Sequence, residues 1–530
     1  MVASISNRAG RREWLGLAVI ALPCVLYSMD LTVLNLAVPR LSADLKPTAA
    51  QLLWIVDIYG FLVAGSLITM GTLGDRIGRR RLLMIGAAAF GIASVIAAFS
   101  TSAEMLIATR ALLGIAGATL APSTLSLIRN MFLDPGQRTV AIGIWVTSYS
   151  VGAAIGPLLG GIVLQYFWWG SVFLINLPAM ALLLALGPML LPEFRDPKPG
   201  RFDLLGAVLS LAAVLTVIYG IKRLTVEGLG ALPLASLAVG LMLAVVFIRR
   251  QRVTASPLID IRLFRNRAFT GAVVIGVVAM FALTGYALYT TQYMQLVLGL
   301  SPFVAALWSL VATPAIVISL TLTSMLSKRV RPAYLMCAGM IVAAVGFTLL
   351  TQIRADSSLA HLLVAAGTLV AGVLMATTLT ADMILTAAPP ERAGSASALS
   401  ETSSELGGAL GIAILGSVGA AVYHRQMATI PVDAPPTAAH AAADTLGGAA
   451  AVAAQLPQQA GAALLHAGRE AFTMGLNVTA ITGAAIMALG AVLAIALLRR
   501  VEVSQPPAEG PVTPEAGTTE TATAVPVSQP

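Results

Sequence analysis

The sequence predicts an all-α protein that crosses a membrane many times. Hydrophobic residues make up 58% of its 530 residues, charged residues make up only 11%, and the mean hydropathy is +0.87. Soluble domains usually contain about 25% charged residues. Apolar runs long enough to cross a bilayer as a helix, about 20 residues each, also recur from one end of the sequence to the other. These observations exclude a soluble globular protein.

Fourteen apolar runs fit as membrane spans. The first is too long for a signal peptide and a second follows at once, so we expect it to remain in the protein. The predicted spans are 14–38, 51–74, 82–100, 104–128, 139–166, 170–191, 204–221, 231–248, 268–296, 302–326, 333–352, 358–386, 395–423 and 471–498.

The distribution of basic residues predicts the orientation. Most of the 32 Lys and Arg residues fall in the connections on the same side as the N-terminus, and only a few, Lys222 among them, fall on the opposite side. This positive-inside pattern predicts that both termini are cytoplasmic. The net charge of +8 is therefore a topology signal, and no nucleic-acid partner is expected.

The connections also predict the domain organisation. Polar breaks follow the sixth and the eighth span. We expect a six-span half over 1–200, two extra central spans over 201–252 and a second six-span half over 253–500, as in transporters built from two repeated halves. The external segment 425–470 is predicted to form a short helical hairpin. The tail 501–530, rich in Pro, Thr, Glu and Ala, is predicted to be disordered in the cytoplasm.

An amphipathic connection and two cysteines are further features of the sequence. Segment 257–265 is amphipathic and is expected to lie on the membrane surface. The two cysteines, Cys24 and Cys337, fall inside apolar runs. We expect them to be packing residues that face the membrane, without a disulfide or a metal role.

A single charge, Asp30, interrupts the first predicted span. Counting about 1.5 Å per residue from Trp14 places it roughly 24 Å along the helix, in the outer half of the apolar layer. A carboxylate at that depth is costly unless it is protonated, hydrated or paired. The sequence therefore predicts a water-filled cavity, a buried cation, or both near Asp30.

Arg110, in span four, is the one cation that the predicted spans enclose. It lies about 9 Å from the outer end of its span, and both Asp30 and Asp57 fall at comparable depth. Because arginine keeps its charge in proteins, a fixed counter-charge is expected from one of the two. The resulting pair either takes part in coupling or only stabilises the fold.

The segment between spans two and three combines glycine with charge. Its glycines permit a tight turn and a close approach of two helices, and its acid can pair with the neighbouring bases at the helix ends. An ordinary cytoplasmic loop is the simpler alternative. The residues concerned are Gly71, Gly74, Asp75, Arg76, Gly78 and Arg79.

Span five contains Gly152, Gly156 and Gly160, which recur every four residues and form a bare stripe for close helix packing. Pro157 removes a backbone hydrogen bond and bends the helix. Together with Gly161 these residues form the string Gly-x3-Gly-Pro-x2-Gly-Gly, which is more specific than a general small-residue stripe.

Span thirteen contains two acids, Glu401 and Glu405, four residues apart on one helix face. Two close carboxylates in a low dielectric are not both ionised, so the pair can exchange protons against a bound cation. The alternative is a hydrated vestibule without a coupling role. Asp382, near the cytoplasmic end of span twelve, is predicted to be a rim residue.

Three tyrosines in span nine, Tyr286, Tyr289 and Tyr293, share a helix face. They can offer ring faces to an organic cation. They can equally belong to the aromatic belt at the outer membrane surface.

Several of these motifs resemble one known family. Segment 71–81 is similar to the loop signature of the major facilitator superfamily, and 152–161 matches the antiporter signature of its drug exporters. Segments 54–59 and 168–178 resemble elements of fourteen-span drug:proton antiporters, with Gly170 and Ser171 in place of an Arg and a second Trp. The resemblance implies a major facilitator fold and a pump for quaternary ammonium antiseptics, biguanides and cationic dyes.

This resemblance implies proton-driven export from the bacterial cytoplasm, by a monomer in the inner membrane that needs no cofactor beyond protons. From their depth and spacing, the embedded charged residues are the candidates for proton and cation coupling, and aromatic residues are the candidates for substrate contact; the resemblance supports the acids at 401 and 405. The coupling residues are Asp30, Asp57, Arg110, Glu401, Glu405 and Asp382. The cavity aromatics are Trp54, Tyr59, Tyr286, Tyr289 and Tyr293.

Two alternatives remain at this stage. One is a facilitator that exports a zwitterionic or lipid-like metabolite. The other is a polytopic membrane enzyme or sensor without transport, which a catalytic domain or a cluster of His, Cys and Asp at one membrane face would favour. The sequence contains no phosphate loop, metal cluster or nucleophile triad in a suitable context, so neither an enzyme nor ATP-driven export is expected.

Overall fold

The structure is a computed structural model. It describes residues 8–195, 203–227, 230–254, 257–258, 261–327, 329–387, 393–430 and 436–499. Throughout these residues the regular secondary structure is helical, and fourteen helical segments are long and apolar enough to cross a membrane. The predicted all-α membrane fold is therefore confirmed. The predicted tail at 501–530 lies outside the described residues.

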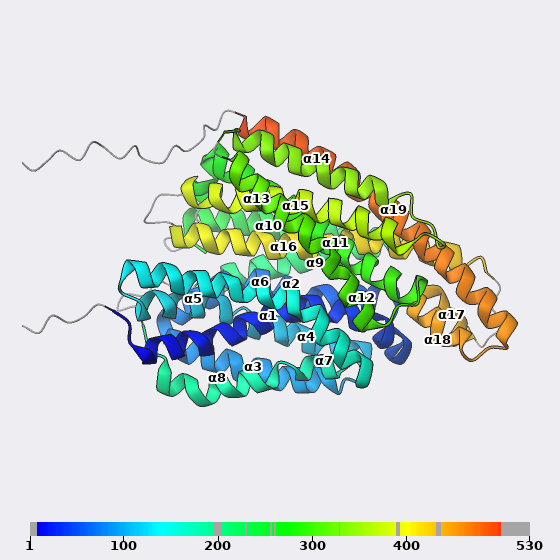
Figure 1. Ribbon diagram of the computed structural model, residues 1–530, viewed down its shortest axis with the longest axis horizontal. Helices are drawn as coiled ribbons and strands as arrows, with labels where there is room; N and C mark the ends of the chain where they lie inside the picture. The colour runs from blue at the N-terminus through cyan, green and yellow to red at the C-terminus, as the bar shows by residue number, and fades with distance from the viewer. Residues whose placement is uncertain are drawn as a thin grey trace, which may run out of the picture.

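The first half of the chain forms the blue-to-cyan helices in the lower part of Figure 1. Its helices are α1 (Arg11–Leu45), α2 (Ala49–Ile77), α3 (Arg79–Ala98), α4 (Ala103–Gly117), α5 (Leu120–Met131), α6 (Pro135–Tyr166), α7 (Ser171–Leu174) and α8 (Leu177–Leu190). The two extra helices follow as α9 (Leu204–Glu227) and α10 (Ala231–Val253), with α9 packed against α2, α16 and α10.

The second half of the chain lies above the first in Figure 1. Its principal helices are α11 (Arg267–Gln292), α12 (Pro302–Ser309), α13 (Thr313–Leu326), α14 (Pro332–Leu350), α15 (Leu359–Ala387), α16 (Ala393–Met427), α17 (Pro436–Asp444), α18 (Leu446–Ala453) and α19 (Gln458–Leu498). Three short elements join them: the 3₁₀ helices η1 (Ile261–Arg265) and η3 (Leu310–Ala312), and the π-helix η2 (Tyr293–Val297).

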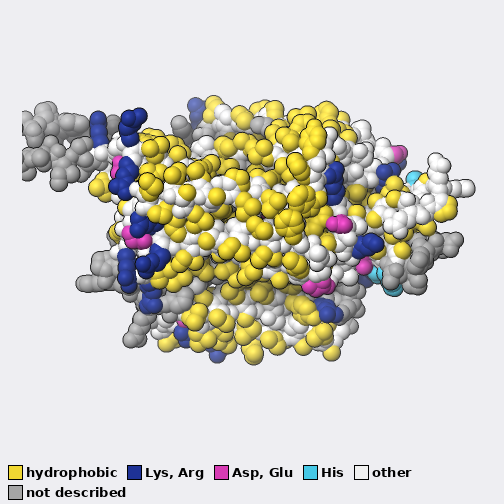
Figure 2. Space-filling view, turned by 90° about the horizontal axis from the view of Figure 1, so that it is seen from below, with side chains coloured by type: hydrophobic (Ala, Val, Ile, Leu, Met, Phe, Trp, Pro, Cys, Tyr) yellow, Lys and Arg dark blue, Asp and Glu magenta, His cyan; other side chains and the backbone are white. Residues whose placement is uncertain are grey.

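The bundle has two distinct ends. The start of α1 and the end of α19 both lie on the left of Figure 1, at the bottom and at the top, and we call this side the terminal end. Helices α17 and α18 lie on the right, at the hairpin end. The predicted helical hairpin is thus present as α17 and α18. Figure 2 shows an apolar belt, with Lys and Arg gathered mostly at the terminal end. This is the pattern of a protein whose belt contacts lipid.

Two predicted spans are broken where proline follows. Span four divides into α4 and α5 around Ala118 and Thr119, because the ring of Pro122 conflicts with the carbonyl four residues earlier. At this break the Thr119 hydroxyl donates to Ala116 O at 2.7 Å. Span ten divides in the same way, with η3 ending two residues before Pro314. Apolar periodicity does not reveal such breaks, since both flanking helices remain apolar.

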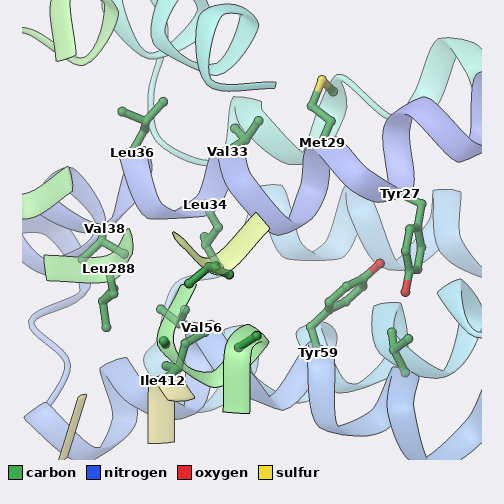
Figure 3. Packing of buried hydrophobic residues seen from close by; sticks show 14 of the residues in the cluster. Tyr27, Met29, Val33, Leu34, Leu36, Val38, Val56, Tyr59, Leu288 and Ile412 are labelled. Carbon is green, nitrogen blue, oxygen red and sulfur yellow. The ribbon is translucent and has the colours of Figure 1, made fainter. Parts of the chain in front are cut away.

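The glycine stripe of α6 receives α1, the helix that carries Asp30. A Cβ atom at Gly152 would meet the backbone of Val25, and Cβ atoms at Gly156 and Gly160 would meet Met29 and Val33. Any side chain at these positions would push the two helices apart. The stripe therefore sets the close α1–α6 packing, and Figure 3 shows the α1 side chains of this core, including Met29 and Val33.

The two halves meet mainly toward the hairpin end. A Cβ at Gly161 of α6 would meet Phe303 of α12, and one at Gly416 of α16 would meet Leu53 of α2. The loop helix α18 packs on the end of α1, where a Cβ at Gly447 would meet Ser42. On the terminal side of these contacts, Glu401 of α16 is exposed. The helix that carries both predicted acids is thus packed at one end and accessible at the other.

Candidate functional site

Asp30 and Arg110 form a buried ion pair between α1 and α4. Their side-chain atoms Oδ2 and Nη1 are 2.6 Å apart, and the side chains are 5% and 1% exposed. Arg110 Nε also donates to Ile55 O of α2, at 3.2 Å, so one guanidinium ties three helices together. Of the two partners that the sequence allows, Asp30 is the one in contact with Arg110.

The rest of the Arg110 pocket is aromatic. The guanidinium lies 4.5 Å from the centroid of the Tyr59 ring and 5.9 Å from that of Phe173. Asn176, which precedes α8, donates to the second Asp30 oxygen at 3.4 Å. The two oxygens of the Asp30 carboxylate therefore accept hydrogen bonds from a guanidinium and from an amide.

A second buried pair corrects the sequence analysis. Lys222 is not external: α9 continues to Glu227, and the Lys222 side chain is 3% exposed with its Nζ 2.8 Å from Asp57 Oδ2. Arg110 is therefore not the only embedded cation. The prediction that Lys222 is external was wrong because it was based on the apolar run, which ends at residue 221. Asp57 on another helix offsets the charge of Lys222, and a hydropathy profile of the sequence does not reveal such a partner.

The two acids of α16 face the first half of the chain. Tyr27 of α1 donates its hydroxyl to Glu405 Oε1 at 2.9 Å, which joins the two halves through one hydrogen bond. Glu401 lies one turn closer to the terminal end, where its side chain is exposed. The pair thus has one carboxylate bound to the opposite half and one open to water.

An aromatic cluster that the sequence analysis did not identify surrounds this hydrogen bond. The ring of Tyr27 lies 6.2 Å from that of Tyr59 and 5.8 Å from that of Tyr149, and Trp145 lies 4.9 Å from Tyr149. Figure 3 shows the hydroxyl groups of Tyr27 and Tyr59 turned toward one another. Ring faces beside carboxylates are the chemistry that recognises organic cations. The i, i+4 spacing of Trp145 and Tyr149 in α6 was the available signal.

The predicted cavity aromatics are divided between several places. Tyr59 lies in the Arg110 pocket, and Trp54 has Lys222 Nζ 3.9 Å from its ring centroid. Tyr289 and Tyr293 use their hydroxyls for helix packing, with bonds to Gly416 O at 2.8 Å and Arg354 O at 2.5 Å. Tyr286 is half-buried in the same helix. The span-nine tyrosines are therefore not gathered around Glu405, and their contact with cargo stays a prediction.

The charged turn between α2 and α3 is tied to the end of α8. Arg79 pairs with Asp75, and the backbone N–H groups of Arg80 and Arg81 donate to the Glu193 carboxylate at 3.1 and 3.2 Å. Gly78 joins the helices with a φ of +108°. The turn fastens three helix ends of one half together. Gly71, Gly74 and Arg76 belong to the end of α2, which precedes this turn.

Two further predictions concern single residues. Cys24 does not face the membrane: it is fully buried and bonds Ile20 O at 3.4 Å, because α6 covers this face of α1. Both cysteines are free, as expected.

The backbone of Asp382 belongs to α15, but its side chain lies outside the described residues, so its assignment as a rim residue stays a prediction.

Comparison with known proteins identifies the family of this chain. The family model described as Major Facilitator Superfamily matches residues 20–412. The chain belongs to the Major Facilitator Superfamily. The fold agrees: an inward-facing, unoccupied bacterial homolog of the human lysosomal transporter Spinster superposes with a TM-score of 0.65 at 17% identity, covering 92% of this chain and 98% of that one. As a superfamily member with fourteen membrane-spanning helices, the protein is a multi-pass membrane transporter and not an enzyme.

Two curated relatives cover almost the whole chain. The "Multidrug efflux pump LfrA" of Mycolicibacterium smegmatis is 42% identical over 495 residues, which are 93% of this chain and 98% of that protein. The "Methyl viologen resistance protein SmvA" of Salmonella typhimurium is 37% identical over 485 residues, 91% of this chain and 97% of that protein. The superfamily assignment thus extends beyond residue 412 to nearly the full length of the chain.

Proposed function

We propose that the protein is a proton-coupled antiporter that exports lipophilic organic cations, such as quaternary ammonium antiseptics, biguanides and dyes, across the bacterial cytoplasmic membrane. The hydrogen bond between Tyr27 and Glu405 carries this proposal, because it places a carboxylate beside a cluster of four aromatic rings at the junction of the halves, with Glu401 one helix turn away. The names of two relatives, a multidrug efflux pump and a methyl viologen resistance protein, support export and a cationic cargo.

The proposed mechanism is competition between protons and cargo. A cation attracted by ionised Glu401 and Glu405 binds among the rings of the aromatic cluster. Protons that arrive from the opposite side neutralise the carboxylates and release the cation there. Deprotonation at the starting side then restores the site. Moving one charge across the membrane potential contributes about 2.3 kcal/mol per 100 mV.

The proposed orientation follows the charge distribution, with the terminal end and both termini in the cytoplasm. In this orientation Glu401 is accessible from the cytoplasm, where cargo is loaded. We propose that Asp30, with Arg110, is the proton site of the first half, because among the described residues it is the acid that pairs with this guanidinium.

The decisive experiment replaces Asp30 by Asn. Removing the carboxylate charge leaves Arg110 buried without its counter-charge, and truncating one partner of a buried pair typically costs about 3–5 kcal/mol. We expect Asp30→Asn to reach the membrane and to lose proton-driven ethidium export by at least tenfold in energised inside-out vesicles. Asp44→Asn is the matched control, because Asp44 lies on the same helix and its bond from Trp169 survives in the amide. Wild-type export by Asp30→Asn would refute the assignment.

A further inference from the structure

A cavity at the terminal end lies between the end of α10 and the short helix η1, away from the site described above. Its volume is about 990 Å³, and residues of both elements line it. Three of the lining side chains are arginines, Arg252 of α10 and Arg262 and Arg265 of η1. The described residues that line it include no Asp or Glu. Two separate elements therefore direct positive charge at one cavity.

Two of these arginines are available to a ligand. Arg252 and Arg265 are exposed, and neither has an ion pair or a hydrogen bond with another described residue. The neighbouring Arg250, in contrast, is engaged by Asp203 at 2.7 Å. The whole segment 249–267 contains six arginines and a single acid, so positive charge remains in excess whatever pairs form within it. Guanidinium groups in this situation suit phosphate, because their N–H donors match two phosphate oxygens.

Apolar side chains at the same cavity are exposed as well. Val253 is 86% exposed, and Phe264 is also exposed; both line the cavity beside the arginines. On α10, the exposed Met242 and Val246 share a helix face with Val253. An apolar stripe thus leads from the membrane-spanning part of α10 to the cavity. Exposed apolar surface of this kind marks a place of contact with a partner or with the membrane.

Charge and apolar surface together indicate the class of ligand. A soluble anion would use the arginines but would leave Val253 and Phe264 in water. An acyl chain alone would use the apolar stripe but would leave Arg252 and Arg265 without a counter-charge. A phospholipid with an anionic headgroup satisfies both, and basic pockets at the ends of membrane helices suit such headgroups. The location agrees, because α10 ends at Val253, where its membrane-spanning segment also ends.

We propose that the cavity between α10 and η1 is a binding site for the headgroup of an anionic phospholipid. The phosphate accepts hydrogen bonds from Arg252 on one element and from Arg265 on the other, and an acyl chain follows the apolar stripe of α10. Helix α10 packs mainly on α9, whereas η1 packs on α11 of the second half. The bound headgroup therefore fastens the end of α10 to the start of the second half. This lipid site is a property separate from the proposed export.

Lipid binding to purified full-length protein tests the site directly. Delipidated protein in detergent is titrated with dioleoylphosphatidylglycerol or with dioleoylphosphatidylcholine, and bound lipid is counted by native mass spectrometry. We expect the wild type to prefer the anionic lipid, and Arg252→Gln/Arg265→Gln to bind it at least tenfold more weakly. Wild-type affinity in this double variant would overturn the inference.

The matched control removes two arginines from the same end of the molecule. Arg11 begins α1 and Arg499 follows α19, and both are exposed and outside the cavity. Arg11→Gln/Arg499→Gln makes the same change in net charge and should keep the wild-type affinity for phosphatidylglycerol. Equal losses in the two double variants would show a general attraction of the basic end to anionic lipid, and would also overturn the inference.

A second measurement distinguishes a lipid from a soluble anion. A ligand that binds the folded protein raises its apparent Tm. Phosphatidylglycerol should raise the Tm of the wild type and of the control variant but not that of Arg252→Gln/Arg265→Gln, and inorganic phosphate should raise none of them. Stabilisation by phosphate that depends on Arg252 and Arg265 would assign the cavity to a soluble anion and overturn the inference. Neither measurement involves export, so failure here leaves the proposed function untouched.

Discussion

Among single residues, Glu401 and Glu405 have the same chemistry and different surroundings. Glu405 accepts a hydrogen bond from Tyr27 across the junction of the halves, whereas Glu401 is exposed one turn away. A dication can engage both carboxylates once each has lost its proton, but a monocation needs only one. Each such contact in a hydrated cavity is worth on the order of 1 kcal/mol. If the protein exports cations as proposed, we expect the pair to discriminate cargo by charge.

The corresponding prediction compares a dicationic with a monocationic cargo. Glu405→Gln and Glu401→Gln should each reduce export of a bis-biguanide about fivefold more than export of ethidium, because 1 kcal/mol corresponds to about that factor. Tyr27→Phe removes only the hydroxyl donor and should leave the ratio of the two cargoes near the wild-type value. Export is measured at matched protein levels. Equal losses for both cargoes in both Gln variants would assign the acids to general coupling instead.

The sequence predicts the charged residues of the site better than their partners. Asp30 and Arg110 stand out because each interrupts an apolar run, and the cost of burial implies a counter-charge. Lys222 does not stand out, because it follows its run and resembles a residue at the membrane surface. Tyr27, Trp145 and Tyr149 are hidden for another reason: aromatic side chains are common in membrane helices, and only the fold shows which rings face a carboxylate.

Among helices and turns, the junction of α2 and α3 depends on one glycine. The φ of Gly78 is +108°, which side chains rarely adopt, and a Cβ there would meet the Glu193 carboxylate. Gly78→Ala should therefore destabilise the protein by about 1–2 kcal/mol through backbone strain, and by more through displacement of Glu193. Gly143→Ala on α6 is the matched control, since a Cβ there meets nothing within 4 Å. An equal apparent Tm for both variants would contradict this account.

The two extra helices are joined at the terminal end by Asp203. Burial by itself would raise the pKa of Asp203, but hydrogen bonds from Arg250, Gly206 and Gln251, with the charge of Arg250, hold it below its ordinary value of 3.8. The unfolded chain then binds the proton more readily than the folded protein. The stability that this carboxylate provides is thus complete above about pH 4 and is lost as the pH falls through the lower, folded pKa.

Asp203→Asn tests this pH dependence. The variant should unfold at a lower apparent Tm than the wild type at pH 7, by the equivalent of about 1 kcal/mol, a modest figure because solvent screens the partly exposed Arg250. The difference should shrink steadily below pH 4. Arg249→Gln is the control, because it removes a neighbouring charge on α10 and leaves the Arg250 partner of Asp203 in place. A difference in Tm that stays constant from pH 7 to pH 3 would contradict the assignment.

At the scale of the whole molecule, the sequence predicts the number of spans and the concentration of Lys and Arg at one end of the bundle, because these follow from hydropathy and charge. It does not predict which helices of the two halves touch, since those contacts join residues hundreds of positions apart. Leu53 with Gly416 and Tyr27 with Glu405 are examples. The structure places the contact of Leu53 with Gly416 toward the hairpin end, so cargo can leave there only after this contact separates.

The last prediction tests this separation with a disulfide between the halves. A Cβ at position 416 would lie 3.7 Å from Leu53 Cγ and would clash with Leu53 Cδ2, an atom that a cysteine at 53 lacks. Leu53→Cys/Gly416→Cys should therefore form a disulfide on oxidation without displacing α2 or α16. We expect oxidation to reduce ethidium export at least tenfold and reductant to restore it. The two single variants, which retain the native Cys24 and Cys337, are the controls and should be insensitive to oxidation. If the cross-linked protein exports ethidium as fast as the protein treated with reductant, this contact does not separate during transport. Opening must then occur elsewhere between the halves.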